Sequence, residues 1–316
     1  MHILESLDAL DRTLYPKPVL ALGNFDGVHL GHQAIFRQVL TRAQALGGTS
    51  MVFTFDPHPA RVINPEKAPP LLTTFEQKMR LIAALGIGVG LRVRFTDTFA
   101  RQPPEAFIRD ILVDQIGVRH LVVGYDCRFG HRRAGTAELL QEMAETYGYQ
   151  VTVVPPITEA GMMVSSSNIR QLVTQGQVED ANRLLGRYYA VEGTVIKGFQ
   201  RGRTIGFPTA NVDVINDVIP QTGVYAVRVE WQEKRYDGVA NVGYNPTFAN
   251  QALSVEAHLF DFEADLYGES IRVEFLRKIR DERKFASVDD LTAQIARDSA
   301  TAHGIHAEFH ATEKTR

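Results

Sequence analysis

The sequence predicts an α/β protein of two domains: a parallel β-sheet with covering helices, then a small antiparallel β-barrel or sandwich closed by a C-terminal helix. The chain has 316 residues, which exceeds one ordinary domain and favours two. Up to about residue 185, short apolar runs alternate with helical patterns, as in βαβ units. Beyond that point the strands have a period of about two, and no long helix intervenes until about residue 287.

The first domain is predicted from its alternating elements. Its strand-like runs are Val19–Leu22, Ser50–Phe55, Val89–Phe95, His120–Val123 and Gln150–Val154. Helical patterns lie between them, near residues 31–46, 74–85, 103–116 and 135–147. The spacing of Thr74 and Gln77 is that of a capping box, which marks a helix start. Because parallel sheets bind ligands at the carboxyl ends of their strands, we expect the site in the loops that follow these runs.

The second domain is predicted from period-two strands that glycines and prolines separate. These strands are Ala190–Ile196, Val224–Trp231, Leu253–Phe260 and Ile271–Phe275. An amphipathic helix is expected from Ser287 to about Ala302. The change of pattern places the domain boundary near residues 183–188, and we take the domains as 1–185 and 186–316.

Composition and charge exclude several classes of protein. The formal net charge is −3, so no general attraction to nucleic acid is expected. A single cysteine, Cys127, rules out an internal disulfide framework and a multi-thiolate zinc site. No apolar run reaches about 18 residues, and the first residues lack the features of a signal peptide. We therefore expect a cytoplasmic protein without a membrane or nucleic-acid partner; an oligomer is compatible with the sequence but is not predicted.

The stretch GNFDGVHLGH, residues 23–32, follows the first predicted strand and opens a helical pattern. If His29 and His32 lie in the first turn of that helix, their side chains share a face. The N–H groups of that turn and the helix dipole favour an anion, so the stretch suits a polyphosphate. Gly27 and Gly31 would allow a ligand close to the backbone. The alternatives are ordinary exposed histidines beside a glycine turn, or a zinc site, for which only Asp26 is a further local ligand.

This stretch resembles the His-x-Gly-His motif of the nucleotidyltransferase superfamily, in particular the N-terminal module of the bacterial bifunctional riboflavin kinase/FAD synthetases. Three later segments agree with that family in order: Thr54–Pro59, Val123–Gly130 and Ser165–Arg170. The resemblance covers essentially the whole chain and implies a Rossmann-like nucleotidyltransferase fold for the first domain. The chain departs from the family at Ser167, where threonine is usual. It also departs at Cys127, where an aromatic residue is usual. We expect both changes to be mild, because Ser167 keeps a hydroxyl and a buried cysteine packs as a small apolar group; looser packing of the nucleotide at Cys127, and so a weaker adenylyltransferase, stays the alternative.

The chemistry that this resemblance implies is adenylyl transfer from ATP to FMN. The FMN phosphate attacks the α-phosphorus of ATP and pyrophosphate leaves. That nucleophile is already an anion, so the protein must align the reactants and neutralise charge rather than supply a base. The resemblance implies His29, His32 and Arg170 as catalytic groups. The residues that it implies in substrate binding are Gly23, Asn24, Phe25, Asp26, Gly31, Asp56, Pro57, His58, Asp126, Ser166 and Ser167.

The densest motif of the second half is residues 198–212, which lacks the Gly-Lys-Ser/Thr ending of a Walker loop. In an extended segment Thr209 and Asn211 face the same way. Their neutral oxygens suit Mg²⁺ that carries nucleotide phosphates, although a turn at a strand edge is the simpler interpretation. Glu256 lies on the polar side of its predicted strand, opposite Val255 and Ala257, where a carboxylate can face a cleft.

Residues 207–212 match the Pro-Thr-Ala-Asn motif of riboflavin kinases, and residues 255–262 and 265–268 match that family's downstream segment. The resemblance implies Glu256 as the base that takes the proton of the riboflavin 5′-hydroxyl as it attacks the γ-phosphorus of ATP. It also implies Thr209 and Asn211 as ligands of Mg²⁺. The binding residues that it implies are Gly198, Gly202, Arg203, Pro208, Thr209, Asn211, Arg280 and Glu282.

The sequence therefore predicts a bifunctional enzyme that makes FMN and then FAD, with ATP as co-substrate and Mg²⁺ as the metal. Two alternatives stay open. One is a chain in which only one half is active. The other is a catalytically silent flavin- or nucleotide-binding regulator, which we would expect to lack Glu256, Asn211 or His32, and all three are present.

Overall fold

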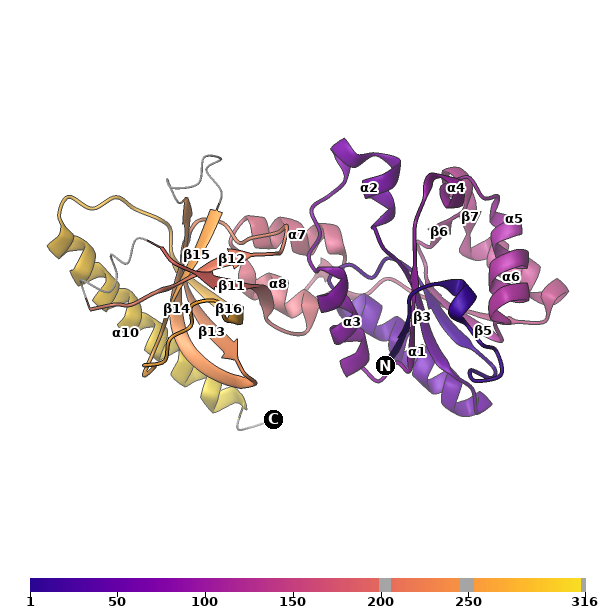
Figure 1. Ribbon diagram of the computed structural model, residues 1–316, viewed down its shortest axis with the longest axis horizontal. Coiled ribbons are helices and arrows are strands. Elements are labelled where there is room, and N and C mark those ends of the chain that lie inside the picture. Colours follow the sequence, from indigo (N-terminus) through magenta and orange to yellow (C-terminus); the bar gives the residue numbers. More distant parts are fainter. Residues whose placement is uncertain (199–205, 245–252, 314–316) are drawn as a thin grey trace. The chain divides into compact units, whose positions relative to one another are not determined.

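The computed structural model describes residues 1–198, 206–244 and 253–313. They divide into two compact units, Met1–Ser166 and Ser167–Arg316, each of which is described by itself (Figure 1). Within these residues no helix has both the length and the apolar character that crossing a bilayer requires.

The first unit contains a six-stranded, all-parallel sheet in the order β1-β4-β3-β2-β5-β8. This confirms the predicted fold class of the first half. The strands are β1 (His2–Leu4), β2 (Val19–Leu22), β3 (Ser50–Phe55), β4 (Val89–Val93), β5 (His120–Gly124) and β8 (Gln150–Val154). The edge strand β1 was not predicted, because three residues are too few to show a period.

Helices cover both faces of this sheet because successive side chains of a buried strand point to opposite sides. On one face, Ala21 of β2 packs with α1 (Leu30–Leu46) and α3 (Phe75–Ala84). On the other face, Leu20 packs with α6 (Ala137–Tyr147) and with the π-helical segment η3 (Phe107–Ile116), which continues the short helix α5 (Pro104–Ala106). The smaller elements are η1 (Leu7–Ala9), α2 (Pro59–Ile63), η2 (Pro65–Lys67), α4 (Asp97–Ala100), η4 (His131–Arg133), and the paired short strands β6 (Arg128–Phe129) with β7 (Gly135–Thr136) and β9 (Thr158–Glu159) with β10 (Met162–Met163).

The strand order locates the expected ligand site. From β2 the chain moves to β3 and β4 on one side, then crosses to β5 on the other side of β2. Such a reversal leaves a crevice at the carboxyl ends of the strands, where open α/β sheets bind ligands. The loops that follow β2 and β5 border this point, and the first of them is the GNFDGVHLGH stretch.

The second unit contains a closed barrel in the order β11-β12-β15-β14-β13-β16, with every pair antiparallel. Closure selects the barrel over the sandwich, and its interior is filled by apolar side chains such as Val195, Val212, Val255 and Phe275. The strands are β11 (Tyr189–Ile196), β12 (Ala210–Val214), β13 (Gly223–Trp231), β14 (Lys234–Tyr244), β15 (Leu253–Leu259) and β16 (Ser270–Arg280).

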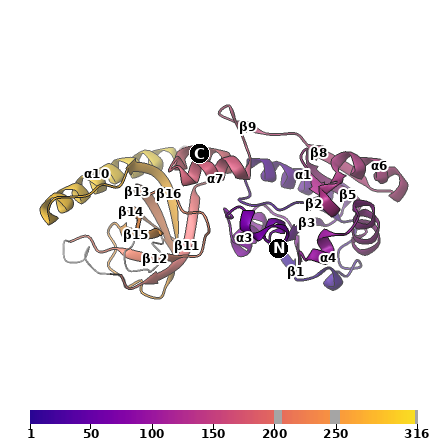
Figure 2. The ribbon, with the colours of Figure 1, turned by 90° about the horizontal axis from the view of Figure 1, so that it is seen from above.

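A long C-terminal helix, α10 (Val288–Glu313), packs on the barrel, and Figures 1 and 2 both show it lying against one side of the strands. Its Ala302 and Ile305 are buried against Val224 and Leu276. The helix was predicted, but it continues about eleven residues past the expected end near Ala302.

Two further helices, α7 (Ser166–Thr174) and α8 (Val178–Leu185), lie at the division between the units. The side-chain amide of Asn182 in α8 donates to the carbonyl of Phe275 in β16 at 2.9 Å and accepts from the N–H of Tyr189 at 2.6 Å. α8 therefore packs with the barrel, whereas the predicted boundary follows it at 185/186. The predicted boundary divides the chain by activity, and in that sense it stays a prediction.

Candidate active sites

The loop after β2 has an unusual backbone. Phe25, Gly27 and Val28 have φ angles of 54°, 79° and 43°, a region that is unfavourable for Phe and more so for the β-branched Val. Such a conformation persists only where surrounding contacts hold it. It turns the chain sharply from the end of β2 into the start of α1.

The two histidines stack on each other at the start of α1, with ring centroids 3.5 Å apart. His29 is the N-cap residue, and its Nδ1 accepts the backbone N–H of His32 at 3.3 Å. The two rings share a face, as expected, but only His32 lies in the first turn of α1, because His29 is the residue that caps it. A Cβ added at Gly31 would lie 3.1 Å from Nδ1 of His29, so this glycine makes room for the His29 ring itself. Similarly, Gly23 makes room for the ring of Phe25.

A small cavity of about 30 Å³ lies beside this loop. Four of the predicted binding residues line it, namely Asn24, Asp26, Asp56 and His58. The other lining residues are Phe55, Leu71, Thr73, Phe75 and Lys78. The topology thus brings the loop after β2 and the segment after β3 to one place, as the sequence predicted.

Asp26 is only 6% exposed, and its carboxylate is used within the protein. It accepts the backbone N–H groups of Leu72 at 2.9 Å and Thr73 at 3.2 Å. The Oγ of Ser166 donates to the backbone carbonyl of Asp26 at 2.9 Å. Asp26 and Ser166 therefore stabilise the loop after β2 through hydrogen bonds within the protein.

The segment after β3 is held by an ion pair with β4 and by a helix cap. Asp56 forms an ion pair with Arg92 of β4, with Nε to Oδ2 at 2.9 Å. Pro57 follows a cis peptide bond and is exposed. His58 caps α2, and its Nδ1 accepts the N–H of Ala60 at 3.2 Å.

The other predicted polar residues of the first site lie in the loop after β5 and in α7. Asp126 is exposed in the loop after β5. Ser167 and Arg170 lie in α7, beyond the division between the units, with Ser167 exposed and Arg170 half-buried. Burial raises the pKa of the Cys127 thiol to about 12, so a thiolate nucleophile is not formed there near neutral pH.

Lys78 is a residue of this cavity that the sequence analysis missed. It is 7% exposed, and its Nζ lies 3.1 Å from the carbonyl oxygen of Asn24 and 3.0 Å from Oγ1 of Thr54. The signal was present in the helical pattern. Phe75, Lys78, Met79 and Ile82 recur at i, i+3, i+4 and i+7, so a lysine stands on the core-facing side of α3.

In the second unit, Glu256 lies in a polar row that crosses three adjacent strands. It is paired with Asn211 of β12 on one side and with Asn241 of β14 on the other. Directly opposite residues of an antiparallel pair point to the same face, and all three side chains are half-buried. The rows on either side, Ala210–Ala257–Ala240 and Val212–Val255–Val242, are buried. The barrel register thus places a carboxylate between two carboxamides, and Asn241 is a second residue that the sequence analysis missed.

The other predicted residues of this site surround the row. Thr209 is half-buried and precedes β12 on the same side as Asn211. A Cβ at Gly198 would lie 2.5 Å from Cγ of Asn211, so only glycine leaves space for that carboxamide. The carbonyl of Pro208 accepts a hydrogen bond from His258 at 2.7 Å. Gly202 and Arg203 lie outside the described residues.

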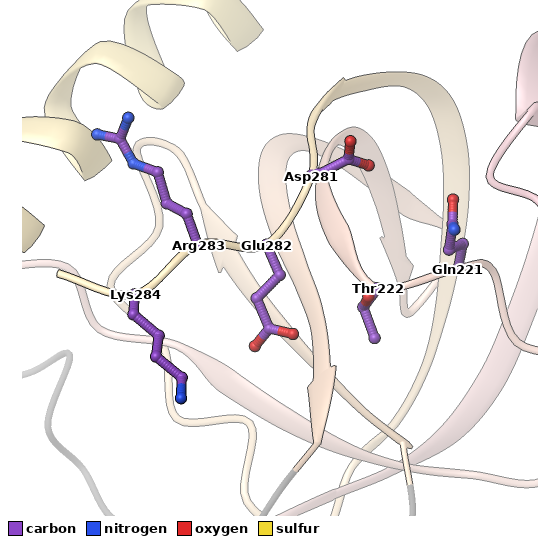
Figure 3. A pocket seen from close by; sticks show the side chains of 6 residues that line it. All are labelled: Gln221, Thr222, Asp281, Glu282, Arg283 and Lys284. Carbon is purple, nitrogen blue, oxygen red and sulfur yellow. The ribbon is translucent and has the colours of Figure 1, made fainter.

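A larger cavity of about 510 Å³ lies where β16 ends (Figure 3). Gln221, Thr222 and the residues from Asp281 to Lys284 line it, and Figure 3 shows the Glu282 and Lys284 side chains extending in the same direction. A Cβ at Gly243 would lie 3.2 Å from Oε1 of Glu282 and 3.0 Å from Nδ2 of Asn241. Glu282 therefore connects this cavity with the polar row.

Arg280 does not line the cavity. Its guanidinium forms two parallel bonds with Asp298 of α10, Nε to Oδ1 at 3.0 Å and Nη2 to Oδ2 at 2.7 Å. Asp298 is 4% exposed, so this pair fastens α10 to the barrel. Among the described residues, no group of three or more His, Cys, Asp and Glu side chains has the arrangement of a metal site.

Comparison with known families divides the chain into two matches. The family model for FAD synthetase matches residues 12–168, and that for riboflavin kinase matches residues 185–306. These matches fall on the parallel-sheet unit and on the barrel.

Curated relatives match across nearly the whole chain. A bifunctional riboflavin kinase/FMN adenylyltransferase of Escherichia coli is 41% identical over 303 residues, covering 96% of this chain and 97% of the relative. A protein of the same description from Bacillus subtilis is 42% identical over 291 residues, covering 90% and 92%. A solved structure described as a macrolide-efflux protein of Streptococcus pneumoniae is 32% identical, with a TM-score of 0.84 over 94% of this chain and 96% of that one.

Proposed function

This chain belongs to the family of bifunctional riboflavin kinase/FMN adenylyltransferases, and we propose that it uses two separate sites, one in residues 186–316 and one in residues 1–185. It phosphorylates riboflavin to FMN with ATP, and it adenylylates FMN to FAD with a second ATP. The observation that carries the proposal is a contrast between the sites. The barrel presents a carboxylate between two carboxamides, whereas the sheet presents two stacked imidazoles at a helix N-terminus.

The barrel site suits the kinase step. A hydroxyl nucleophile must lose a proton, and Glu256 is the carboxylate of the polar row that can accept it. Asn211 and Asn241 flank it and can orient the carboxylate and the ribityl chain. The cavity of about 510 Å³ at Glu282 is adjacent to the row and is the space that we assign to riboflavin.

Magnesium is part of the proposal for this site. The donor set fits, because Thr209 and Asn211 alternate with the buried Ala210 and Val212 and so offer neutral oxygens on the face of Glu256. When bound, Mg²⁺ shields the phosphate charges of ATP. Thr209 and Asn211 would hold the ion, while Glu256 holds the proton that leaves the substrate hydroxyl.

The sheet site suits the adenylyl transfer. The FMN phosphate needs no base, so alignment and charge neutralisation suffice. His29 and His32 place two imidazoles at the N-terminus of α1, where the helix N–H groups already favour phosphate. We assign Asn24, Asp56 and His58 to the substrates, Asp26 and Ser166 to support of the loop, and Asp126, Ser167 and Arg170 to the nucleotide. Ser166 and Arg170 are one turn apart on α7.

The experiment that tests the proposal follows FMN and FAD by chromatography after incubation with riboflavin, ATP and Mg²⁺, and in parallel with FMN as the input. Appearance of FMN and then FAD supports both sites. FMN alone would mean that only the kinase half is active, and neither product would favour a silent flavin-binding protein. We also propose that the protein acts in the cytoplasm on these small molecules, without a nucleic-acid partner, in keeping with its net charge of −3.

A further inference from the structure

Lys78 presents a positive charge in the interior of the first unit. Its side chain lies on the core-facing side of α3 and is 7% exposed. The two oxygens that its Nζ contacts, the carbonyl of Asn24 and the hydroxyl of Thr54, are both uncharged. The charged groups that act on it are Asp26, Asp56, Glu76 and Arg92, and His58 lines the same cavity.

A buried ammonium group is unfavourable for folding unless a carboxylate bonds to it directly, because it loses its hydration. The neighbours of Lys78 on the helix, Phe75, Met79 and Ile82, show that an apolar residue would suit this position. A charge that burial disfavours, placed at a cavity with substrate-binding residues, is a candidate for a functional role.

The contacts of α3 and the residues just before it identify that role. The carboxylate of Asp26 is held by the N–H groups of Leu72 and Thr73. The N–H of Gly27 donates to Oγ1 of Thr73 at 3.2 Å, and Nζ of Lys78 donates to the carbonyl of Asn24. The segment Leu72–Lys78 thus bonds directly to three of the four loop residues 24–27, namely 24, 26 and 27, on both sides of Phe25 with its unfavourable φ of 54°.

We propose that Lys78 is a positioning residue for FMN adenylylation. Its ammonium group donates to the Asn24 carbonyl and so holds the loop that places His29 and His32 near the triphosphate. This inference rests on the proposed function of the first site. The geometry calls for a hydrogen-bond donor of lysine length at this point, since the donor must reach both Asn24 and Thr54 from the core side of α3.

The pH dependence gives a readout that a merely structural side chain would not move. Burial lowers the pKa of Lys78 from 10.5 to about 8, against the opposing effect of Asp26 and Asp56. Above about pH 8 the ammonium becomes a neutral amine and donates more weakly, so adenylylation declines. The free energy of unfolding changes with pH in the opposite direction to the rate. Between about pH 8 and 10.5 Lys78 binds more protons in the unfolded state than in the folded state, so its contribution to stability rises with pH.

The test compares Lys78→Met with Lys67→Met in the full chain; Lys67 is an exposed lysine of the same unit. Rates of FMN adenylylation and of riboflavin phosphorylation are measured from pH 6.5 to 9.5, together with Tm. We expect Lys78→Met to lower kcat of adenylylation about 10-fold to 100-fold, as small misplacements of catalytic groups do. KM should change little, the kinase rate should be unchanged, and Tm should not fall, because methionine relieves the burial of charge. The decline above pH 8 should be present in the wild type and absent from Lys78→Met.

Adenylylation by Lys78→Met within twofold of Lys67→Met would overturn the proposal. If Lys78→Met fails to fold, the wild-type profile decides. A decline above pH 8 in adenylylation but not in the kinase rate supports the proposal, and parallel profiles overturn it. The wild-type rate at pH 7 separates this inference from the proposed function, since a chain that never adenylylates FMN would refute the function of the site itself.

Discussion

The two candidate sites are held in place by different means. In the sheet unit, the loop after β2 is held by buried polar contacts with the segment Leu72–Lys78; Asp26 and His29 of the loop and Lys78 of α3 are all less than 10% exposed. In the barrel, Glu256, Asn211 and Asn241 are half-buried and are brought together by strand register. Chemistry and support are therefore mixed in the first site and separate in the second, which makes the barrel residues the cleaner targets for substitution.

The largest effect is expected for Glu256→Ala. Loss of the base should lower riboflavin phosphorylation by about 10²-fold to 10⁴-fold and leave adenylylation of added FMN intact. Both rates are measured on one preparation, with Thr194→Ala, at an exposed position of β11, as a control for disturbance of the barrel. An unchanged rate of riboflavin phosphorylation in Glu256→Ala would contradict this assignment, whereas loss of both activities would indicate misfolding.

His32→Ala should have the next largest effect. Removal of a phosphate donor should lower adenylylation by about 10-fold to 10³-fold, as loss of one oxyanion donor does. The ring of His32 packs edge-on against Phe25 at 5.2 Å, so Tm must be recorded beside the rate. His32→Gln keeps a donor and serves as the comparison. Unchanged FAD formation in His32→Ala would remove this residue from the site.

Asn241→Ala sharpens the comparison, because register alone predicts its effect. Asn241 lies directly opposite Glu256, and a hydrogen bond from its carboxamide to the carboxylate during the reaction would be worth about 1.5–3 kcal/mol, so the kinase rate should fall about tenfold or more. Asn241→Asp would place a second carboxylate opposite Glu256 and should be at least as damaging. A kinase rate within twofold of the wild type for both variants would show that Asn241 does not contribute to the kinase site.

The smallest effect is expected for Cys127→Ser. Burial raises the pKa of this thiol to about 12, and the side chain packs against the apolar cluster beneath the sheet. Both activities should stay within about twofold of the wild type, since exchanges on this scale away from the chemistry change stability more than rate. A loss of adenylylation with Tm unchanged would give the thiol a chemical role.

Much of the fold could be predicted because continuous apolar runs define buried parallel strands. β2 and β3 were predicted to the residue, and the capping box at Thr74 correctly started α3. β14 was missed because its first residues, Lys234–Asp237, are largely polar and glycines interrupt the rest. The end of α10 was missed because its last turns are held by tertiary packing, with Ile305 and His306 buried on the barrel.

Site residues that stand in a sequence motif could be predicted, whereas those outside the motifs could not. His29, Asn211 and Glu256 each stand in a motif of characteristic spacing, but Asn241 could not be placed without the register of a strand that had not been recognised. Lys78 was visible as a charge on an apolar helix face, yet its contact with Asn24 joins residues 54 positions apart. Asp26 resembled a ligand contact in sequence, and only the structure places Leu72 and Thr73 against its carboxylate.

The most direct measurement mixes the Glu256→Ala and His32→Ala chains in one tube with riboflavin, ATP and Mg²⁺. Each variant alone should convert riboflavin to FAD more slowly than the wild type, because each is impaired in one step. If the two sites are separate, FMN made by His32→Ala is adenylylated by Glu256→Ala, and the mixture should form FAD at a rate that rises with the concentration of both chains. FAD formation no faster than the sum of the two separate reactions would contradict the account.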